Sequence, residues 1–214
     1  DELAPVSKEI AQRCEVVGNQ LNSVGTTVSF VAKPEHDFMK AEINYQLLLQ
    51  SVMQSGLPED EYQKIEELAS SLDKNDLSVD AILAKGTVLS HRNWIRQNYA
   101  REQIKISWSK FFEEWDVLIC PQLATTAIEH DHRKISERTV MVDNQEQRYF
   151  QQIFWPGLAV NAHLPSTVFP TGLSGDGMPI GLQVIGGAYE DKTTIKFAQL
   201  YEEEFKAFVV PNLD

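Results

Sequence analysis

The chain has 214 residues, of which 43% are apolar and 23% charged, so it has the composition of a globular protein and enough apolar residues for a core. Its formal net charge of −12 repels phosphate backbones and anionic lipid, which argues against nucleic acid and membranes as partners. No apolar run approaches the roughly 20 residues that span a bilayer. No basic-then-apolar signal segment opens the sequence.

Two cysteines, Cys14 and Cys120, lie far apart in the sequence and in apolar surroundings. Two cysteines do not make a disulfide framework, so a pair of buried, reduced thiols is expected. This expectation favours a cytoplasmic protein. The sequence begins with Asp1 instead of methionine, so we expect a processed product or an excised fragment.

Helical spacing of apolar residues dominates the first half of the chain. Pro5 and Ser7 stand near the start of the first predicted helix, Gly86 closes the fourth, and Ser90 caps the fifth. Val28–Val31 is a short β-rich run and predicts a strand. The predicted helices span approximately residues 5–21, 38–53, 59–72, 76–83 and 90–114.

Strands are predicted in the second half. Asp116–Cys120 is a continuous apolar run, which suits a strand covered on both faces. Residues 123–147 are polar and lack periodicity, so they predict a long, mobile loop. The other predicted elements are a helix over 149–162 that Pro156 bends or restarts, strands over 166–169 and 180–185, and a helix over 191–208 capped by Asp191. The residues alone therefore indicate an α/β fold.

No segment shows the pattern of a nucleophile or of a phosphate-binding loop. Ser174 lies in Gly-Leu-Ser-Gly-Asp-Gly, where Asp176 replaces the last glycine of a nucleophile elbow. This stretch joins two predicted strands, so a turn is the better interpretation. The nearby glycines miss the Gly-x-Gly-x-x-Gly spacing and open no helix, so no nucleotide cofactor is expected.

Glu129-His130-Asp131-His132 is the only segment with a suggestion of metal binding. His130 and His132 would lie on one side of an extended chain. Zinc needs three or four ligands with supporting hydrogen bonds, and no spacing elsewhere in the sequence supplies them. A solvated loop without a metal is expected.

Two segments resemble the amidase-signature hydrolases. Residues 157–172 contain Asn161, then Leu-Pro, an apolar strand, Pro and Gly, in the order typical of the family. Residues 177–186 read Gly-Met-Pro-Ile-Gly-Leu-Gln-Val-Ile-Gly, close to the family's Gly-Leu-Pro-x-Gly-Leu-Gln-x-Ile-Gly. His163 stands where the family usually has glycine, and Met178 where it usually has leucine.

The resemblance extends over essentially the whole chain. Residues 116–121, Asp-Val-Leu-Ile-Cys-Pro, resemble the family's Asp-Val-Leu-x-x-Pro strand. The resemblance implies that residues 1–214 are the C-terminal portion of one amidase-like domain, with a mixed central sheet covered by helices. A helical region would span about 1–115 and a strand-containing region about 116–214, with no separate second domain.

The resemblance implies hydrolysis of a carbon–nitrogen amide bond by two serines and a lysine. The family carries these residues in its N-terminal portion, within and upstream of a Gly/Ser-rich signature that this sequence lacks, so no catalytic residue is assigned here. A small-molecule amide is the implied substrate and the N-terminal amidase portion the implied partner, and a homo-oligomer is compatible with this interpretation. The alternative is a non-catalytic structural or interaction subunit derived from an amidase.

Trp155 and Asn161 are the substrate-binding candidates, because they lie near the family's substrate-facing turn. A core position is an equally good interpretation of Trp155, and a local helix-end cap a better one of Asn161. Gln183 is polar within an apolar strand and needs a hydrogen-bond partner. Val117–Ile119 and Val184–Ile185 read as strands buried on both faces, so the chain alone is expected to expose apolar surface.

Overall fold

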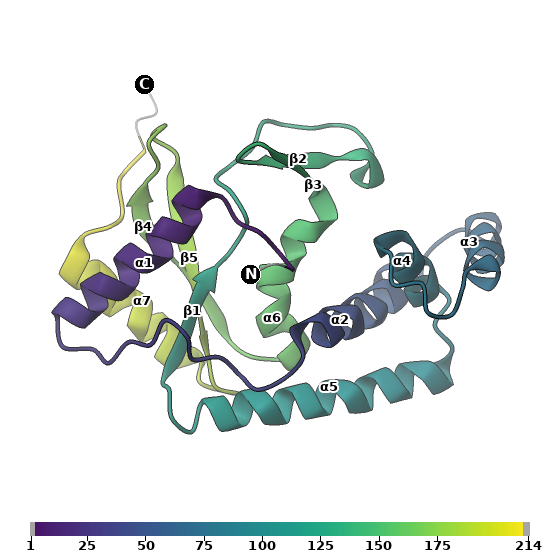
Figure 1. The fold of residues 1–214 in the computed structure, drawn as a ribbon, viewed down its shortest axis with the longest axis horizontal. Coiled ribbons are helices and arrows are strands. Elements are labelled where there is room, and N and C mark those ends of the chain that lie inside the picture. Colours follow the sequence, from purple (N-terminus) through teal and green to yellow (C-terminus); the bar gives the residue numbers. More distant parts are fainter. Residues whose placement is uncertain (1–2, 212–214) are drawn as a thin grey trace. The chain divides into compact units, whose positions relative to one another are not determined.

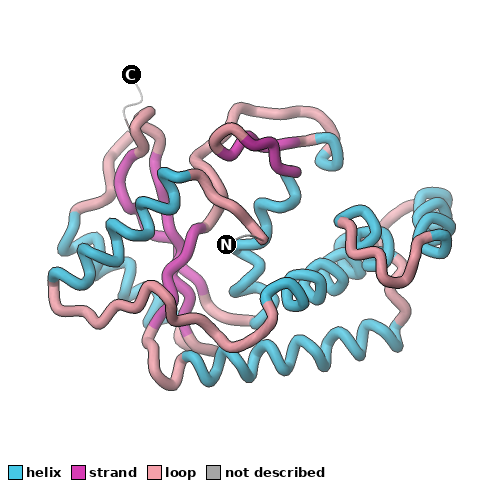
Figure 2. Tube along the Cα trace, in the orientation of Figure 1, coloured by secondary structure: helices cyan, strands magenta, loops and turns pink. Residues whose placement is uncertain are grey.

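The computed structural model describes residues 3–211 (Figure 1). The chain forms two compact units: the chain up to Pro34 together with the chain from Ser109 onwards, and Glu35–Trp108. Within the described residues, all strands belong to the first unit, and the second consists of helices and their connections (Figure 2). The assignment of both units to a single amidase-like domain stays a prediction.

A three-stranded sheet in the order β1-β5-β4 forms the centre of the first unit. Its strands are β1 (Val117–Pro121), β4 (Ser166–Leu173) and β5 (Pro179–Gly186), which confirms the three predicted strands of the second half. β4 runs further than predicted, past a β-bulge. All ladders among residues 3–211 are antiparallel, so the parallel pairs of a mixed sheet would need strands from outside this range.

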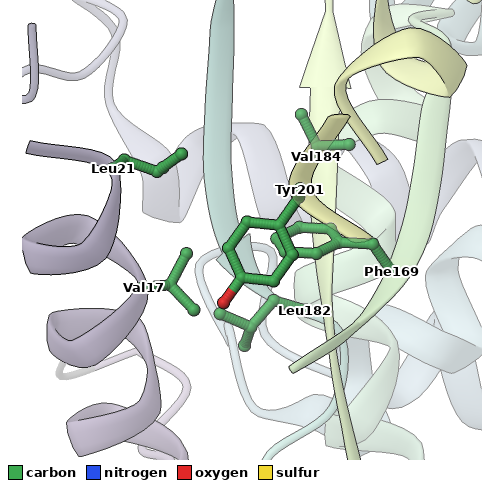
Figure 3. Packing of buried hydrophobic residues seen from close by; sticks show 6 residues of the cluster. All are labelled: Val17, Leu21, Phe169, Leu182, Val184 and Tyr201. Carbon is green, nitrogen blue, oxygen red and sulfur yellow. The ribbon is translucent and has the colours of Figure 1, made fainter. Parts of the chain in front are cut away.

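Helices α1 (Lys8–Ser23) and α7 (Asp191–Phe205) pack on one face of this sheet (Figure 1). Alternate strand residues point to the same face, which brings apolar side chains of β4 and β5 toward the two helices. Figure 3 shows the resulting core, formed by Val17, Leu21, Phe169, Leu182, Val184 and Tyr201. The rings of Phe169 and Tyr201 meet edge to face, with centroids 4.9 Å apart.

Charged side chains of α1 fix this helix to the β4–β5 hairpin. The Arg13 guanidinium donates hydrogen bonds to the backbone carbonyls of Thr171 and Leu173. Glu9 accepts one from the backbone N–H of Gly175 at 2.7 Å. The ladder is irregular between Pro170 and Leu173, and Arg13 supplies a donor to the Thr171 carbonyl inside this bulge.

The predicted strand at Val28–Val31 is wrong, because this segment forms no ladder with any described strand. The Ser29 hydroxyl accepts hydrogen bonds from the backbone N–H groups of Val31 and Ala32, at 3.3 and 3.0 Å. Such local bonds give the backbone an alternative to a ladder. Val31 is 86% exposed, so its β-branched side chain has no sheet face to pack on.

Two helix ends differ from the prediction. Ser90 caps α5 (His91–Phe111) as predicted, but this helix ends before residue 114. The predicted cap of α7 by Asp191 is wrong: Asp191 is the first helical residue, and Glu190 precedes it without a side-chain capping bond. α7 also stops before residue 208, because Lys206 adopts a left-handed conformation with φ 50°.

Residues 123–147 contain regular structure, which corrects the prediction of an irregular loop. A short 3₁₀ turn, η1 (Ile135–Glu137), precedes a hairpin of β2 (Thr139–Val142) and β3 (Gln145–Arg148). The hairpin turn begins at Asp143, whose φ of 53° suits a tight reversal. Periodicity could not reveal β3, because its four residues are all polar.

The predicted helix over 149–162 is two elements. The 3₁₀ helix η2 (Tyr149–Ile153) leads into α6 (Phe154–Ala162), so the helix restarts as predicted. Pro156 lies in the first turn of α6, where a missing backbone N–H costs no intrahelical hydrogen bond. His163 ends the helix in the left-handed region with φ 55°.

The second unit contains α2 (Phe38–Met53), α3 (Glu59–Ser71), α4 (Val79–Thr87) and α5 up to Trp108. The prediction that Gly86 closes α4 is wrong, because Gly86 is buried inside the helix. A Cβ at this position would lie 2.8 Å from the Cβ of Gln50 and 3.2 Å from the backbone of Leu47. Gly86 therefore allows α4 to approach α2 closely.

Candidate functional site

Helix α6 carries both residues that the sequence predicts to bind substrate. Trp155 lies in its first turn and is half-buried, and Asn161 lies in its last turn and is only 5% exposed. The six-residue separation turns their side chains about 120° apart around the helix and about 9 Å apart along it. α6 therefore does not place them on one face, and their role in substrate binding stays a prediction.

The indole N–H of Trp155 is a buried donor without a hydrogen-bond partner among the described residues. The ring of Trp155 lies edge to face with Phe154, at 5.3 Å between centroids. A buried N–H that is left unpaired costs about 1–3 kcal/mol, so a bound acceptor at this position would be stabilised. A carbonyl oxygen, such as that of an amide, is one such acceptor.

Gln183 connects the strands of the sheet to α6. Its side-chain amide donates to the backbone carbonyls of Pro121 at 3.1 Å and Trp155 at 2.7 Å, and its carbonyl accepts from the Ser166 hydroxyl at 3.0 Å. Gln183 is 1% exposed, so these bonds offset the cost of burying an amide. The prediction that Gln183 needs a partner is confirmed, and its position is structural.

Replacing Gln183 with leucine should lower the free energy of unfolding by about 2 kcal/mol. Leucine keeps the bulk of the side chain but removes the donor of the buried hydrogen bond to the Pro121 carbonyl and of the part-buried one to the Trp155 carbonyl. Urea denaturation followed by circular dichroism measures the loss. The matched control is Gln199→Leu on the exposed side of α7, where a change within about 0.5 kcal/mol is expected. Equal effects of the two substitutions would contradict the structural role of Gln183.

Ser174 lies in the turn between β4 and β5, as predicted. Its hydroxyl accepts a hydrogen bond from the backbone N–H of Met178 at 3.0 Å, and its backbone carbonyl accepts one from Gly177 at 3.0 Å. This hydroxyl therefore stabilises the turn. No described histidine, lysine or carboxylate forms a hydrogen bond with it in the structure.

The histidines of the 123–147 segment lie on the chain that leads to the β2–β3 hairpin. The ring centroids of His130 and His132 are 6.2 Å apart. Between them Asp131 pairs with Arg133 at 2.7 Å, and hydrogen bonds from Arg133 lower the pKa of the Asp131 carboxyl to about 2. Residues 3–211 contain no group of three or more histidine, cysteine or acidic side chains placed to hold a metal ion.

A serine and a histidine that the sequence analysis did not bring together are neighbours in the second unit. The His36 Nδ1 and the Ser107 hydroxyl lie 3.1 Å apart. The His36 ring also packs on Phe38, with centroids 4.4 Å apart, and burial lowers the pKa of the imidazole. His36 stands between two acids, Glu35 and Asp37. Asp37 caps α2 by accepting from the backbone N–H of Lys40, and the one hydrogen bond of the His36 ring in the structure goes to Ser107, so neither acid is seen to orient the imidazole as the third group of a catalytic triad does. His36 and Ser107 lie 71 residues apart in the sequence, which explains why sequence spacing alone could not reveal this pair.

Both cysteines are free thiols, as predicted. Burial raises the pKa of the Cys14 thiol to about 11, and it raises that of the fully buried Cys120 still further. Neither thiol forms an appreciable thiolate at neutral pH, so neither has the activated state that cysteine nucleophiles need.

None of the helices in residues 3–211 combines the length and the apolar character that crossing a bilayer requires.

Curated relatives match part of this chain. The A subunit of the glutamyl-tRNA(Gln) amidotransferase of Thermosynechococcus vestitus is 34% identical over 111 residues, which are 51% of this chain and 21% of that protein. The corresponding protein of Listeria monocytogenes serotype 4a is 33% identical over 105 residues, or 49% of this chain and 20% of its own length. The matched part therefore spans about a fifth of the length of these relatives.

Solved structures share the fold over nearly the whole chain. The A subunit of the glutamyl-tRNA(Gln) amidotransferase of Thermotoga maritima superposes with a TM-score of 0.65 at 16% identity, covering 100% of this chain and 44% of that one. A 6-aminohexanoate cyclic dimer hydrolase gives a TM-score of 0.60 at 18% identity, covering 94% and 42%. These similarities confirm the α/β fold. The sequence profile of the family described as Amidase matches residues 1–195, and the chain therefore belongs to the amidase-signature family.

Proposed function

We propose that this chain is the C-terminal portion of an amidase-signature hydrolase that cleaves a carbon–nitrogen amide bond. The family match over residues 1–195 carries this proposal. A lysine would act as the base through a bridging serine onto a nucleophilic serine, and backbone N–H groups would bind the tetrahedral oxyanion. These groups would belong to amidase chain outside the present 214 residues.

The chain would contribute sheet, covering helices and part of a substrate pocket. The unpaired donor on Trp155 and the burial of Asn161 favour α6 as the element that faces a small-molecule amide. Residues 123–147 are a second candidate for the pocket wall. The partner would be the N-terminal amidase portion, in a cytoplasmic protein, with a homo-oligomer as a further possibility.

The pure chain is expected to show no amide hydrolysis. Ser174 is engaged in a turn, and the His36 ring that faces Ser107 has no hydrogen bond to an acid in the structure, so neither serine has the full set of partners of an activated nucleophile. The measurements are turnover of activated anilides against a heat-treated sample, and labelling by a fluorophosphonate probe. Adding a purified N-terminal amidase portion should bring turnover above that background.

The Ser107→Ala variant is the matched control for this experiment. Stoichiometric labelling of the chain that disappears in Ser107→Ala would overturn the proposal and identify His36–Ser107 as a second reactive centre. Labelling that persists in this variant would point to another serine. Absence of turnover with every N-terminal portion tested would favour the non-catalytic subunit derived from an amidase.

A further inference from the structure

Two helices of the second unit carry opposite charge. α3 contains five acidic residues and one lysine. The part of α5 that belongs to the second unit, residues 91–108, contains four basic residues and one glutamate. The chain as a whole has a net charge of −12, so this basic helix departs from the average of the sequence. The second unit therefore presents one strongly acidic and one basic helix.

Both helices are poorly covered by the rest of the described chain. α3 has no buried residue, and in α5 only Trp108 is buried. α3 packs on α4, and its half-buried residues Tyr62, Ile65 and Ala69 recur at the spacing of one helix face. The remaining surface of α3 is exposed. A helix of 13 residues is marginal in water, so α3 would gain stability from a partner on its outer side.

A continuous exposed stripe runs along α5. Its residues follow one another at alternating steps of four and three, which places them on one side of the helix. Tyr99 is 69% exposed and Ile106 is 47% exposed, so the stripe combines two cations at one end with apolar surface beyond them. The five exposed residues of this α5 stripe are Arg92, Arg96, Tyr99, Gln103 and Ile106.

The charges on both helices are unfavourable within one copy of the chain. Arg92 lies in the first turn of α5, at the positive end of the helix dipole, and this turn has no acidic residue. Arg96 follows four residues later, so the two guanidinium groups repel each other. Glu66 and Glu67 lie in the second half of α3, whose last turn has no basic residue to balance the negative end of the dipole. A partner of opposite charge would compensate both helices.

α3 and α5 do not neutralise each other within one chain. No ion pair joins the two helices among residues 3–211. Glu66 and Glu67 are exposed on α3. Arg92 and Arg96 are exposed on α5. A second copy of the chain supplies the opposite charge to both helices at once, whereas a polyanion would be repelled by the net charge of −12.

We propose that two copies of this chain associate by placing the outer side of α3 of each copy on the α5 stripe of the other. A two-fold dimer makes this contact twice. Leu68 is 48% exposed beside Glu67 and gives α3 an apolar residue to pack against Tyr99 or Ile106. Because exposed charges contribute most of the contact, the dimer is weak and sensitive to salt. The proposal goes beyond amide hydrolysis and does not depend on it.

Charge reversal on each helix tests the proposal, with sedimentation velocity of the 214-residue chain in low salt as the measurement. The double variant Arg92→Glu/Arg96→Glu makes the α5 stripe acidic, and Glu66→Lys/Glu67→Lys makes the same part of α3 basic. Each variant alone brings like charges together, so its self-association should be weaker than that of the unchanged chain by at least about tenfold. An equimolar mixture of the two variants should restore the dimer, because each helix then meets the opposite charge.

A matched variant separates this contact from a general effect of net charge. Lys192→Glu/Lys196→Glu on α7 changes the charge by the same amount as the double arginine variant, at two exposed positions of the first unit. It should leave self-association unchanged. The thermal midpoints of the α3 and α5 variants, measured by circular dichroism, should not fall, because each reversal moves a helix toward the charge distribution that its dipole favours.

Restored association in the mixture, and its loss at high salt, would support the proposal. Self-association that survives both double variants would overturn it and point to uncovered apolar surface instead. An unchanged chain that stays monomeric in low salt would overturn it as well, and retention of that monomer on an anionic resin through Arg92 and Arg96 would favour a polyanionic partner. None of these measurements involves turnover, so failure of the dimer leaves the proposed hydrolysis of amides unaffected.

Discussion

Replacing Phe169 with alanine is expected to lower the free energy of unfolding by about 3–5 kcal/mol. Phe169 is fully buried between the sheet and α7, and its ring contacts both Phe197 and Tyr201. The loss combines apolar transfer, the cavity left behind and the aromatic pairs. A typical domain has only about 5–15 kcal/mol of stability, so the variant should be close to unfolding.

Urea denaturation followed by far-ultraviolet circular dichroism measures this change. Phe208→Ala is the control, because Phe208 lies after α7 and is 57% exposed. Its removal should change stability by no more than about 0.5 kcal/mol. Similar midpoints for the two variants would show that the core of Figure 3 does not determine the stability of this unit.

The strands of the central sheet were accessible to sequence reasoning because apolar strands and a buried polar residue leave clear signals. Three apolar runs predicted β1, β4 and β5, and the isolated Gln183 among apolar residues predicted a hydrogen-bonded position. Val28–Val31 has an equally good β composition, yet it forms no ladder. Strand propensity describes fit to a half-buried pleated surface, and no described strand offers this segment such a surface.

Short polar elements and distant side-chain pairs left no comparable signal. The β2–β3 hairpin depends on the Asp143 turn and on a strand of polar residues, which period-two patterning cannot detect. The approach of His36 to Ser107 depends on the packing of helices far apart in sequence. The two predicted substrate contacts, Trp155 and Asn161, came from family resemblance, and helix geometry alone directs them to different sides of α6.

The sequence analysis also missed a series of hydrogen bonds through two glutamine side chains near the β2–β3 hairpin. Gln152 accepts a hydrogen bond from the backbone N–H of Ala124 at 3.1 Å and donates to the Gln147 side chain at 3.2 Å. Gln147 in turn donates to the Pro5 carbonyl at 3.0 Å. Glutamines are common on surfaces, so their sequence positions gave no indication that these residues connect separate segments of the first unit.

Gly86 offers a sharper test, because its two interpretations predict effects of opposite sign. If Gly86 merely lay at an unconstrained position in or near the end of α4, leucine should stabilise the helix by up to about 1 kcal/mol through its higher helix propensity. In the structure, a Cβ at Gly86 would lie 3.2 Å from the backbone of Leu47, and 2.8 Å from the Cβ of Gln50. Backbone atoms of α2 cannot rotate away as a flexible side-chain end can.

Gly86→Leu should therefore destabilise the second unit by about 3 kcal/mol, because the added side chain separates α4 from α2. Hydrogen exchange measured by mass spectrometry should show lost protection in α2 and α4, the two helices whose packing is broken. Gly56→Leu is the matched control, since a Cβ there meets no atom within 4 Å and the residue is exposed. Stabilisation by Gly86→Leu, or the same exchange pattern in both variants, would show that close approach of the two helices at Gly86 is not required for the fold of this unit.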